Sequence, residues 1–239
     1  MSAGKIYAGT SGWAYASWKP DFYPAKLSSK KFLEYYASRL NSVEVNYTFR
    51  SIPTEKLLSG WIETTPSEFK FAIKAHQSIT HFKRLRDATG VTTEFMDSLQ
   101  PLRKAKKLGP VLFQLRGDFK CDVPLLKDFL KGLPRGTQAT FEFRNVSWFC
   151  DEVYEALRKS NVALCLAESD DLETPNVATA DFSYLRLRKP NYSVKAREVI
   201  AEKVAGLTQK GEVFAYFKHE DTPDGAVYAE DLLKSTSNH

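Results

Sequence analysis

In the stretch FEFR, residues 141–144, each phenylalanine is followed by a charged residue. Successive side chains of a β-strand point to opposite faces, so Phe141 and Phe143 share one face and Glu142 and Arg144 share the other. A carboxylate beside a guanidinium can transfer protons, bind an anionic group or form a buried ion pair. Which of these it does depends on what the charged face of the strand meets.

The same alternation occurs in other strand-like runs, and a polar residue falls near the carboxyl end of most of them. In SVEVNYTF, for example, Val43 and Val45 leave Glu44 and Asn46 on the opposite face. If the strands form a closed barrel, these polar residues meet at one end of its interior. The full set is Glu44, Asn46, Lys74, Gln114, Glu142, Arg144, Glu168, Arg186, Arg188 and His219.

Charges gathered inside a barrel must either pair with one another or hold a ligand, because an unpaired buried charge costs several kcal/mol. For a ligand site, we expect Glu44, Lys74 and Glu142 to be catalytic, with the two glutamates moving protons. Lys74 would also help Arg144 and Arg186 to hold an anion. The residues expected to bind the ligand are Asn46, Gln114, Arg144, Glu168, Arg186 and His219. An internal ion-pair layer without a ligand is the alternative.

Eight strand-like runs alternate with helical patterns along the chain. The runs are 5–10, 42–49, 68–75, 109–115, 138–144, 162–168, 182–188 and 212–218, and helices are expected at 28–40, 54–63, 91–108, 123–133, 150–160, 194–210 and 224–235. This order predicts an α/β fold with a parallel sheet, and its size predicts a TIM-type (β/α)8 barrel in a single domain, 1–239.

Two local features refine the fold prediction. Segment 169–181 is short and contains a proline, so we expect an irregular barrel in which the helix after the sixth strand is missing or very short. The first strand is followed by TSGW and not by a GxGxxG fingerprint, which argues against an open, doubly wound dinucleotide-binding sheet.

Composition is that of an ordinary globular protein, with 43% hydrophobic and 26% charged residues. No apolar run approaches the ~20 residues of a transmembrane helix, and the first residues lack the features of a signal peptide. The three cysteines have no CxxC spacing, which indicates reduced thiols. We therefore expect a cytoplasmic protein with no membrane partner, and the net charge of +5 favours anionic partners.

No cofactor is predicted from the sequence, which contains neither an HxH nor an HExxH motif. The side chains of Glu44, His76, Glu142, Glu168 and His219 could nevertheless converge at the ends of the strands. A divalent metal therefore stays open as an alternative to metal-independent chemistry.

Basic and aromatic residues gather in the loops that follow strands, on the side of the polar cluster. The basic residues are Lys83, Arg84, Arg86, Lys189 and Lys195. Among the aromatic residues, Trp13 and Trp148 are best suited to stack on a base or a sugar ring. This combination makes a nucleic acid the alternative partner to a small anion.

Ordered blocks along the chain resemble the YecE-like family, a TIM-barrel domain of unknown function (domain of unknown function 72). The blocks are GTSGWAYASWKPDFYP (9–24), EVNYTF (44–49), FKFAIKA (69–75) with TH (80–81), LGPVLFQL (108–115) and EFRNVSW (142–148). The resemblance covers nearly the whole chain. The functional residues that it implies are Gly12, Trp13, Glu44, Asn46, Lys74, His81, Gln114, Glu142, Arg144 and Trp148.

The chain departs from the pattern of this family at Asn145, where histidine is frequent, and at Lys218 and His219, where two asparagines are common. The family is similar in fold to endonuclease IV-type barrels, which implies nucleic acid as a substrate. The chain lacks the many histidine ligands that such metal-dependent enzymes use.

Three functions follow from these observations. The leading hypothesis is an enzyme, a hydrolase, lyase or isomerase, that acts on a small anionic substrate, phosphorylated or sugar-like. It would use metal-independent acid–base chemistry in a pocket at the carboxyl-end face of the barrel. The alternatives are a protein that binds or processes nucleic acid, and a ligand-binding barrel without catalysis.

Overall fold

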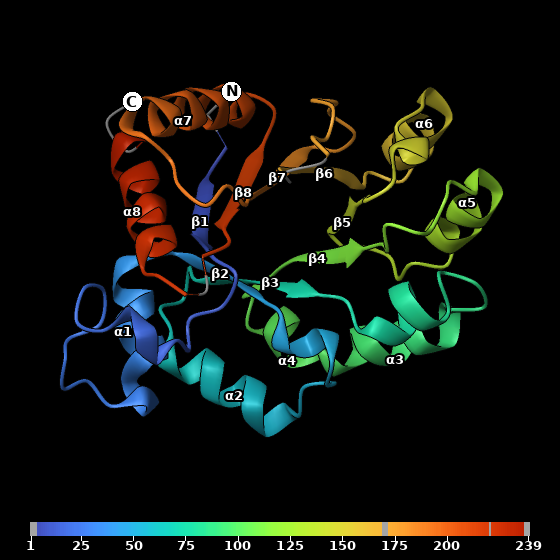
Figure 1. Ribbon diagram of the computed structural model, residues 1–239. Helices are drawn as coiled ribbons and strands as arrows, with labels where there is room; N and C mark the ends of the chain where they lie inside the picture. The colour runs from blue at the N-terminus through green and yellow to red at the C-terminus, as the bar shows by residue number, and fades with distance from the viewer. Residues whose placement is uncertain (1–3, 169–171, 220, 237–239) are drawn as a thin grey trace.

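The computed structural model describes residues 4–168, 172–219 and 221–236. Its strands form one eight-stranded parallel sheet in the order β1-β8-β7-β6-β5-β4-β3-β2. The strands are β1 (Ile6–Thr10), β2 (Ser42–Val45), β3 (Lys70–Lys74), β4 (Leu108–Gln114), β5 (Ala139–Glu142), β6 (Ala163–Ala167), β7 (Phe182–Leu187) and β8 (Glu212–Phe217). Figure 1 shows them as a ring with the helices outside it, which is the predicted barrel.

The helices are α1 (Phe32–Arg39), α2 (Glu55–Thr64), α3 (Thr89–Ser98), α4 (Gln100–Lys104), α5 (Val123–Lys131), α6 (Asp151–Lys159), α7 (Val194–Thr208) and α8 (Asp224–Thr236). Thr54 caps α2 as a helix-start signal should, because its hydroxyl accepts a hydrogen bond from the Leu57 amide at 3.3 Å. The single helix expected at 91–108 is instead divided into α3 and α4. Pro101 lies in the first turn of α4 and has no N–H with which to continue the ladder of α3.

The connection between β6 and β7 contains no helix among its described residues, 168 and 172–181, as the sequence predicts. Threonine side chains of this loop form hydrogen bonds with the backbone of β6 and of the residue before it. Thr179 Oγ1 accepts from the Leu164 amide and donates to the Val162 carbonyl, both at 2.8 Å. Side-chain hydroxyls thus hold the loop against a strand that elsewhere in the barrel would be covered by a helix.

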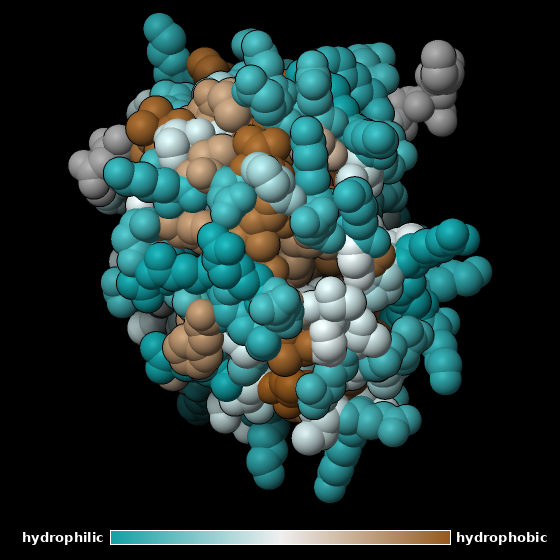
Figure 2. Space-filling model, turned by 90° about the vertical axis from the view of Figure 1, so that its right-hand side faces the viewer, coloured by the Kyte–Doolittle hydropathy of each residue, from teal (hydrophilic) through white to brown (hydrophobic). Residues whose placement is uncertain are grey.

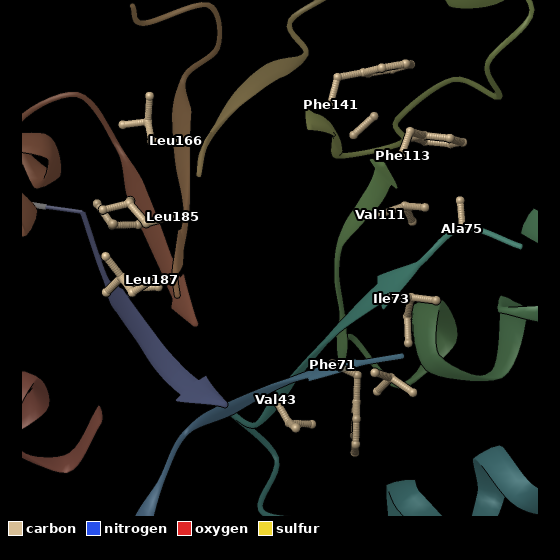
Figure 3. Packing of buried hydrophobic residues seen from close by; sticks show 14 of the residues in the cluster. Val43, Phe71, Ile73, Ala75, Val111, Phe113, Phe141, Leu166, Leu185 and Leu187 are labelled. Atoms are coloured by element: carbon tan, nitrogen blue, oxygen red, sulfur yellow. The ribbon is translucent and has the colours of Figure 1, made fainter. Parts of the chain in front are cut away.

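Alternate side chains of each strand point to opposite faces of the sheet. Val43, Phe71, Phe113, Phe141 and Leu185 point away from the barrel axis towards the helices (Figure 3), where the Phe113 and Phe141 rings stack at 5.2 Å. The residues of opposite parity line the interior. Its apolar part includes Tyr7, Ala72, Leu112, Tyr184, Phe214 and Tyr216. The interior is therefore filled with side chains, and its buried charged groups lie towards the carboxyl ends of the strands.

The barrel closes between β1 and β2 largely through side chains. One isolated backbone bridge joins Ser11 to Glu44. Elsewhere the Asn41 side chain accepts from the Ala8 amide at 2.9 Å and donates to the Ile6 carbonyl at 2.8 Å. The Tyr36 hydroxyl similarly accepts from the Thr10 amide and donates to the Ser42 carbonyl. These contacts satisfy backbone groups that a regular ladder would pair.

Two strands, β2 and β5, end at least two residues earlier than the sequence predicts. The chain leaves β2 after Val45 and makes a 3-10 turn at Tyr47–Phe49, and β5 ends at Glu142. Arg144 consequently lies beyond the strand, and 39% of its side chain is exposed. It borders the end of the barrel interior and is not enclosed by it.

The surface seen in Figure 2 is mostly polar. On the side that carries α3, α5 and α6, hydrophilic residues cover most of the surface, and hydrophobic residues form a discontinuous strip between them (Figure 2). Among the described residues, no helix combines the length and apolar character needed to cross a membrane.

Candidate functional site

Arg186, on the inner face of β7, is the centre of a buried ion-pair cluster. Its Nη2 donates to Glu44 Oε1 at 2.8 Å, and its Nη1 donates to Glu142 Oε2. The two glutamates come from β2 and β5, so one guanidinium connects three strands across the interior. None of the three side chains is more than 2% exposed. Each buried charge is therefore compensated by an opposite one.

Glu44 accepts two further hydrogen bonds. Ser11 Oγ donates to its Oε1 and Tyr184 Oη donates to its Oε2, both at 2.7 Å. Ser11 directly follows β1, and Tyr184 precedes Arg186 by two residues on the same face of β7. Every partner of this carboxylate is thus supplied by the ends or the inner face of a strand.

Glu142 is equally buried and contacts more arginines than Glu44 does. Gln114 Nε2 donates to its Oε2 at 2.8 Å, and Arg144 Nε donates to its Oε1 at 3.0 Å. Arg188 Nη1 approaches the same Oε1 at 3.4 Å. Three arginines therefore surround one carboxylate, and Arg144 extends from it to the surface.

The pKa values of both carboxyl groups are shifted downwards. Burial alone would raise the pKa of Glu44 and of Glu142. The positive charge of Arg186, together with the hydrogen bonds that each carboxylate accepts and, for Glu142, the charges of Arg188 and Arg144, outweighs burial and holds both pKa values below their usual range. The acid forms are consequently not populated near neutral pH. Proton transfer by these two glutamates, which the sequence led us to expect, does not fit this geometry, since a general acid or base needs a pKa near the working pH.

Lys74, at the end of β3, has a different environment. Its Nζ lies 4.2 Å from the centre of the Phe49 ring. Within the part of the chain that the structure describes, its Nζ makes no hydrogen bond and no ion pair. Burial and the positive charge of Arg186 lower the pKa of Lys74 to about 8, although Glu44 and Glu142 act in the opposite direction. This amine therefore titrates much closer to neutrality than an ordinary lysine.

His81 lies near the same amine. Its ring meets the Phe49 ring edge-on at 4.8 Å, so Phe49 contacts both Lys74 and His81. Burial lowers the pKa of His81, and the positive charges of Lys74, Arg116 and Arg144 lower it further. The imidazole is therefore neutral at neutral pH, surrounded by cations.

Three other predicted residues lie after β1 and β2. The Asn46 Oδ1 atom is buried and has no hydrogen-bond partner among the described residues, which leaves an acceptor for a ligand. Gly12 has a φ of +102°, and a Cβ at this position would lie 2.5 Å from the Tyr15 hydroxyl, so the turn requires glycine. Trp13 is half-buried and meets the Trp61 ring edge-on at 5.4 Å.

The prediction that Trp148 stacks on a ligand is wrong. Its side chain is fully buried, its Nε1 donates to the Phe119 carbonyl at 2.6 Å, and one face stacks on Phe143 at 4.7 Å. An aromatic residue after a strand can equally close the core beneath a loop, and here it does.

Glu168 and His219 belong to a separate group of residues. Glu168 accepts a hydrogen bond from the Tyr192 hydroxyl and lies 3.7 Å from Lys189 Nζ. His219 Nε2 lies 3.1 Å from the Pro190 carbonyl oxygen, and its ring contacts Tyr192. The Glu168 amide donates to the Arg186 carbonyl at 3.1 Å, but the described side-chain contacts link neither residue to the Arg186 guanidinium.

The carboxylate oxygens of the central cluster are already used by arginine, serine, tyrosine and glutamine donors. Across residues 4–168, 172–219 and 221–236, no group of three His, Cys, Asp or Glu side chains has the proximity that a metal ion would need.

Sequence reasoning missed three contributors to the site, namely Ser11, Phe49 and Tyr184 as partners of the charged residues. The alternation along β7 contains the signal for Tyr184, because it shares its parity with Arg186. Phe49 could not have been found in this way, since it lies in a turn and not in the expected strand.

The family model described as "Protein of unknown function DUF72" matches residues 7–239 of this sequence. The chain belongs to the DUF72 family. UPF0759 protein YunF of Bacillus subtilis (strain 168) is 33% identical over 157 residues, which are 63% of this chain and 54% of that protein. UPF0759 protein YecE of Escherichia coli (strain K12) is 31% identical over 145 residues, covering 60% of this chain and 50% of YecE. The matched region spans about half the length of these curated relatives.

Solved structures confirm the fold of this DUF72 protein. A DUF72 family protein from Thermotoga maritima has a TM-score of 0.87 at 25% identity and covers 98% of this chain and 99% of its own. D-allulose 3-epimerase from Methylomonas sp., solved in complex with D-allulose, has a TM-score of 0.57 at 12% identity, covering 99% of each chain. The second likeness shows the TIM-type barrel alone.

Proposed function

We propose that this protein is an enzyme that acts on a small anionic substrate, phosphorylated or sugar-like, at the carboxyl-end mouth of the barrel. The observation that carries the proposal is the Lys74 amine. It is largely buried, it lies beside Arg186, and within the described residues it has neither an ion pair nor a hydrogen bond. Such a group is costly to keep unless a ligand or a reaction uses it.

The charge balance at the mouth favours an anion. Glu44 and Glu142 face four cations, Lys74, Arg144, Arg186 and Arg188, so positive charge is in excess. Both terminal nitrogens of Arg186 already bind the two carboxylates. Arg144 makes one hydrogen bond to Glu142 and is partly exposed, which leaves guanidinium donors for a phosphate or carboxylate.

Acid–base chemistry is supported by Lys74 more than by the glutamates. A pKa of about 8 allows the amine to accept a proton and to return it near neutral pH. Glu44 and Glu142 stay ionised and fix the orientation of Arg186, so their role is positioning. Asn46 Oδ1 would accept a hydrogen bond from a substrate hydroxyl.

A barrel in which the charges merely neutralise one another explains only part of the cluster. It accounts for Arg186, Glu44 and Glu142, which bind one another directly. It gives no reason for the lysine next to them, because methionine or leucine would fill the same space without the cost of burying a charge.

Thermal unfolding in the presence of sulfate, glycerol 3-phosphate and hexose phosphates tests the proposed anion site. A bound anion stabilises the folded state by mass action, so the wild-type Tm should rise with anion concentration. Arg144→Ala should abolish the specific part of this rise, and Arg135→Ala, at an exposed position beyond α5, should retain it. An equal response of all three proteins would exclude an anion site at Arg144.

Turnover is tested separately by incubating the protein with phosphorylated sugars and following the products by NMR. A substrate that is converted by the wild type should not be converted by Lys74→Met. Full activity of that variant would refute the assignment of proton transfer to Lys74.

Nucleic acid is the second candidate, because two exposed aromatic side chains lie in the loops at the mouth. Phe82 is 73% exposed and Tyr47 is 53% exposed. Nucleic acid ranks second because two of the nearby cations, Arg84 and Arg86, are paired with Asp118 at 2.7 Å and with Asp122 at 2.9 Å. Binding of a single-stranded oligonucleotide that weakens steeply with salt, and that Phe82→Ala reduces, would favour this candidate.

A further inference from the structure

We propose that Lys74 is a nucleophile that forms an imine with the carbonyl group of a substrate that also carries a phosphate or a carboxylate. This inference rests on the proposed function, since it uses the same anion site, and it adds the chemical class of the substrate and a covalent step. It depends on the place of the amine in the barrel and on what surrounds it.

The position of Lys74 in the barrel suits a nucleophile. Lys74 is the last residue of β3 and shares its inward parity with Ala72, which belongs to the apolar filling of the barrel. Its Nζ is thus presented at the top of a closed interior, as catalytic side chains of TIM barrels are. The strand fixes the amine more firmly than a loop would, which suits a group that must attack a carbonyl carbon along a defined direction.

The neighbours of Lys74 activate its amine. A lysine becomes nucleophilic when an apolar neighbour desolvates it or when another cation lies beside it. Both conditions hold for Lys74. Burial removes water from Nζ, which lies 4.2 Å from the centre of the Phe49 ring, and the positive charges of Arg186 and Arg144 disfavour the ammonium form. The attraction of the ring face for a cation acts in the opposite direction, but the pKa of the amine is lowered all the same. With a pKa of about 8, about a tenth of the molecules carry a neutral amine at pH 7, several hundred times more than for an ordinary lysine.

Among the described residues, no hydrogen-bond or ion-pair partner competes for the Lys74 amine. A lysine whose ammonium served only as a counter-ion would be expected to bind one of the nearby carboxylates. Glu44 and Glu142 instead take their donors from Arg186, Ser11, Tyr184, Gln114 and Arg144. Within the described chain, no hydrogen bond has to be broken before the Lys74 lone pair can react.

The reaction balances without an oxidant or a reductant. The lone pair of the neutral Nζ forms a bond to the carbonyl carbon, the π electrons of the carbonyl bond move to oxygen, and a proton passes from nitrogen to oxygen to give a carbinolamine. A proton from solvent then allows the carbon–oxygen bond to break, and water leaves. The net change consumes one carbonyl group, one neutral amine and one proton, and it yields one protonated imine and one water molecule.

The anionic group of the substrate has two effects at this site. It binds to Arg144, which places the carbonyl near the amine, and it offsets the positive charge that the iminium ion adds to an already cationic cluster. A carbonyl compound without an anionic group lacks both advantages. The structure therefore favours an oxo acid or a phosphorylated aldehyde or ketone over a neutral carbonyl compound.

The test uses pyridoxal 5′-phosphate, an aldehyde with a phosphate group, with sodium borohydride to reduce any imine to a stable secondary amine. Peptide mapping by mass spectrometry then gives the rate of labelling of each lysine in the wild-type chain. Lys70 is a matched internal control, because it lies at the opposite end of the same strand, where its Nζ donates to the Lys106 carbonyl at 2.6 Å.

We expect Lys74 to be labelled at least ten times faster than Lys70 at pH 7, with a labelling rate that rises through pH 8. Lys74→Arg should lose this label, and Lys70→Arg should keep it. Labelling of Lys74 at the same rate as Lys70 in the wild type would overturn the inference, and this result needs no variant to fold.

Two further arms separate this inference from the proposed function. If pyridoxal without phosphate labels Lys74 as fast as the phosphorylated probe, the imine-forming amine stands and the anion site fails. If sulfate raises the Tm through Arg144 but neither aldehyde labels Lys74 preferentially, the anion site stands and the nucleophile is refuted.

Discussion

At the scale of single residues, the site contains two kinds of buried charge. Arg186, Glu44 and Glu142 pair with one another, whereas Lys74 is largely buried beside them without an ion pair among the described residues. The first kind stabilises the fold once it is formed, and the second kind destabilises it. Functional groups are commonly retained at such a cost to stability.

Lys74→Met should therefore stabilise the protein. Because the folded-state pKa is lowered to about 8 from 10.5, the folded state binds fewer protons than the unfolded state between these values, and wild-type stability rises with pH across that window. Below pH 8 the variant should be more stable by up to about 3 kcal/mol. Urea unfolding at several pH values, with Lys70→Met as the control, measures the difference, which should vanish above pH 10.5.

Glu142→Gln should have the opposite effect. The change leaves Arg186 with a single carboxylate partner in a buried site, which costs about 3 kcal/mol. Because the pKa of Glu142 is lowered in the folded state, its stabilisation is complete above the unfolded value of 4.5 and is lost as pH falls through the lower folded value. The wild-type protein should lose stability below pH 4.5 more steeply than the variant; parallel acid-unfolding curves would contradict this account.

The pKa of His81 should change when an anion binds at the carboxyl-end mouth of the barrel. Its pKa is lowered by burial and by the cations Lys74, Arg116 and Arg144, so an anion bound among them should raise it. An NMR titration of the His81 ring with and without saturating sulfate measures the change, and sulfate itself does not titrate in this range. His219, whose ring contacts Tyr192, serves as the internal control. The shift should be absent in Arg144→Ala.

At the scale of elements, the closure between β1 and β2 differs from the rest of the barrel. Its described backbone pairing is one bridge, and the Asn41 and Tyr36 side chains replace the remaining ladder. In the β6–β7 connection, side chains likewise take the place of regular structure, because a threonine hydroxyl binds the backbone of β6 where a helix would otherwise cover the strand. The barrel is regular where helices cover regular ladders and depends on individual side chains elsewhere.

Asn41→Ala should destabilise the protein by about 2 kcal/mol, because it leaves the Ala8 amide and the Ile6 carbonyl without their partners in a largely buried seam. Chemical denaturation measures the loss. Ser38→Ala, which removes an exposed hydrogen bond to the Tyr35 carbonyl on α1, is the control and should change stability by less than about 0.5 kcal/mol. Equal effects of the two changes would show that the seam does not depend on Asn41.

The elements could be predicted from the sequence because strands and helices of this fold have distinct periodicities. The eight strands and the inward parity of Glu44, Glu142 and Arg186 follow from alternation. The lack of a helix in the described part of the β6–β7 connection follows from the short length of that segment and its proline. What alternation could not supply was the pairing of the charges, which depends on contacts between distant strands. It also could not distinguish Trp148, buried beneath a loop, from an exposed aromatic residue.

At the scale of the whole molecule, Arg186 connects parts of the barrel that are distant in sequence. β7 pairs with β6 and β8, yet its arginine binds carboxylates of β2 and β5 through the interior. The guanidinium thus links strands that share no ladder with β7. Stability of the closed barrel should depend on this side chain more than on any arginine at the surface.

Arg186→Met should cost at least about 3 kcal/mol, because it leaves Glu44 and Glu142 buried without their main cation. Arg144→Met removes a partly exposed contact to the same Glu142 and should cost less than about 1 kcal/mol. Urea unfolding of the two variants gives the comparison. A similar loss of stability in both variants would mean that the ion pairs of Arg186 with Glu44 and Glu142 are not a main support of the fold.

The ion pair between Glu44 and Arg186 also limits the order in which the chain can fold. Glu44 and Arg186 are separated by 142 residues, and ribosomes add about 5–20 residues per second, so the carboxylate is exposed to solvent for many seconds before its guanidinium exists. Closing the interior around Glu44 earlier would bury a charge without its cation. The nascent chain should therefore keep its first six strands open until β7 has emerged, and this interval is when the protein most needs protection from aggregation.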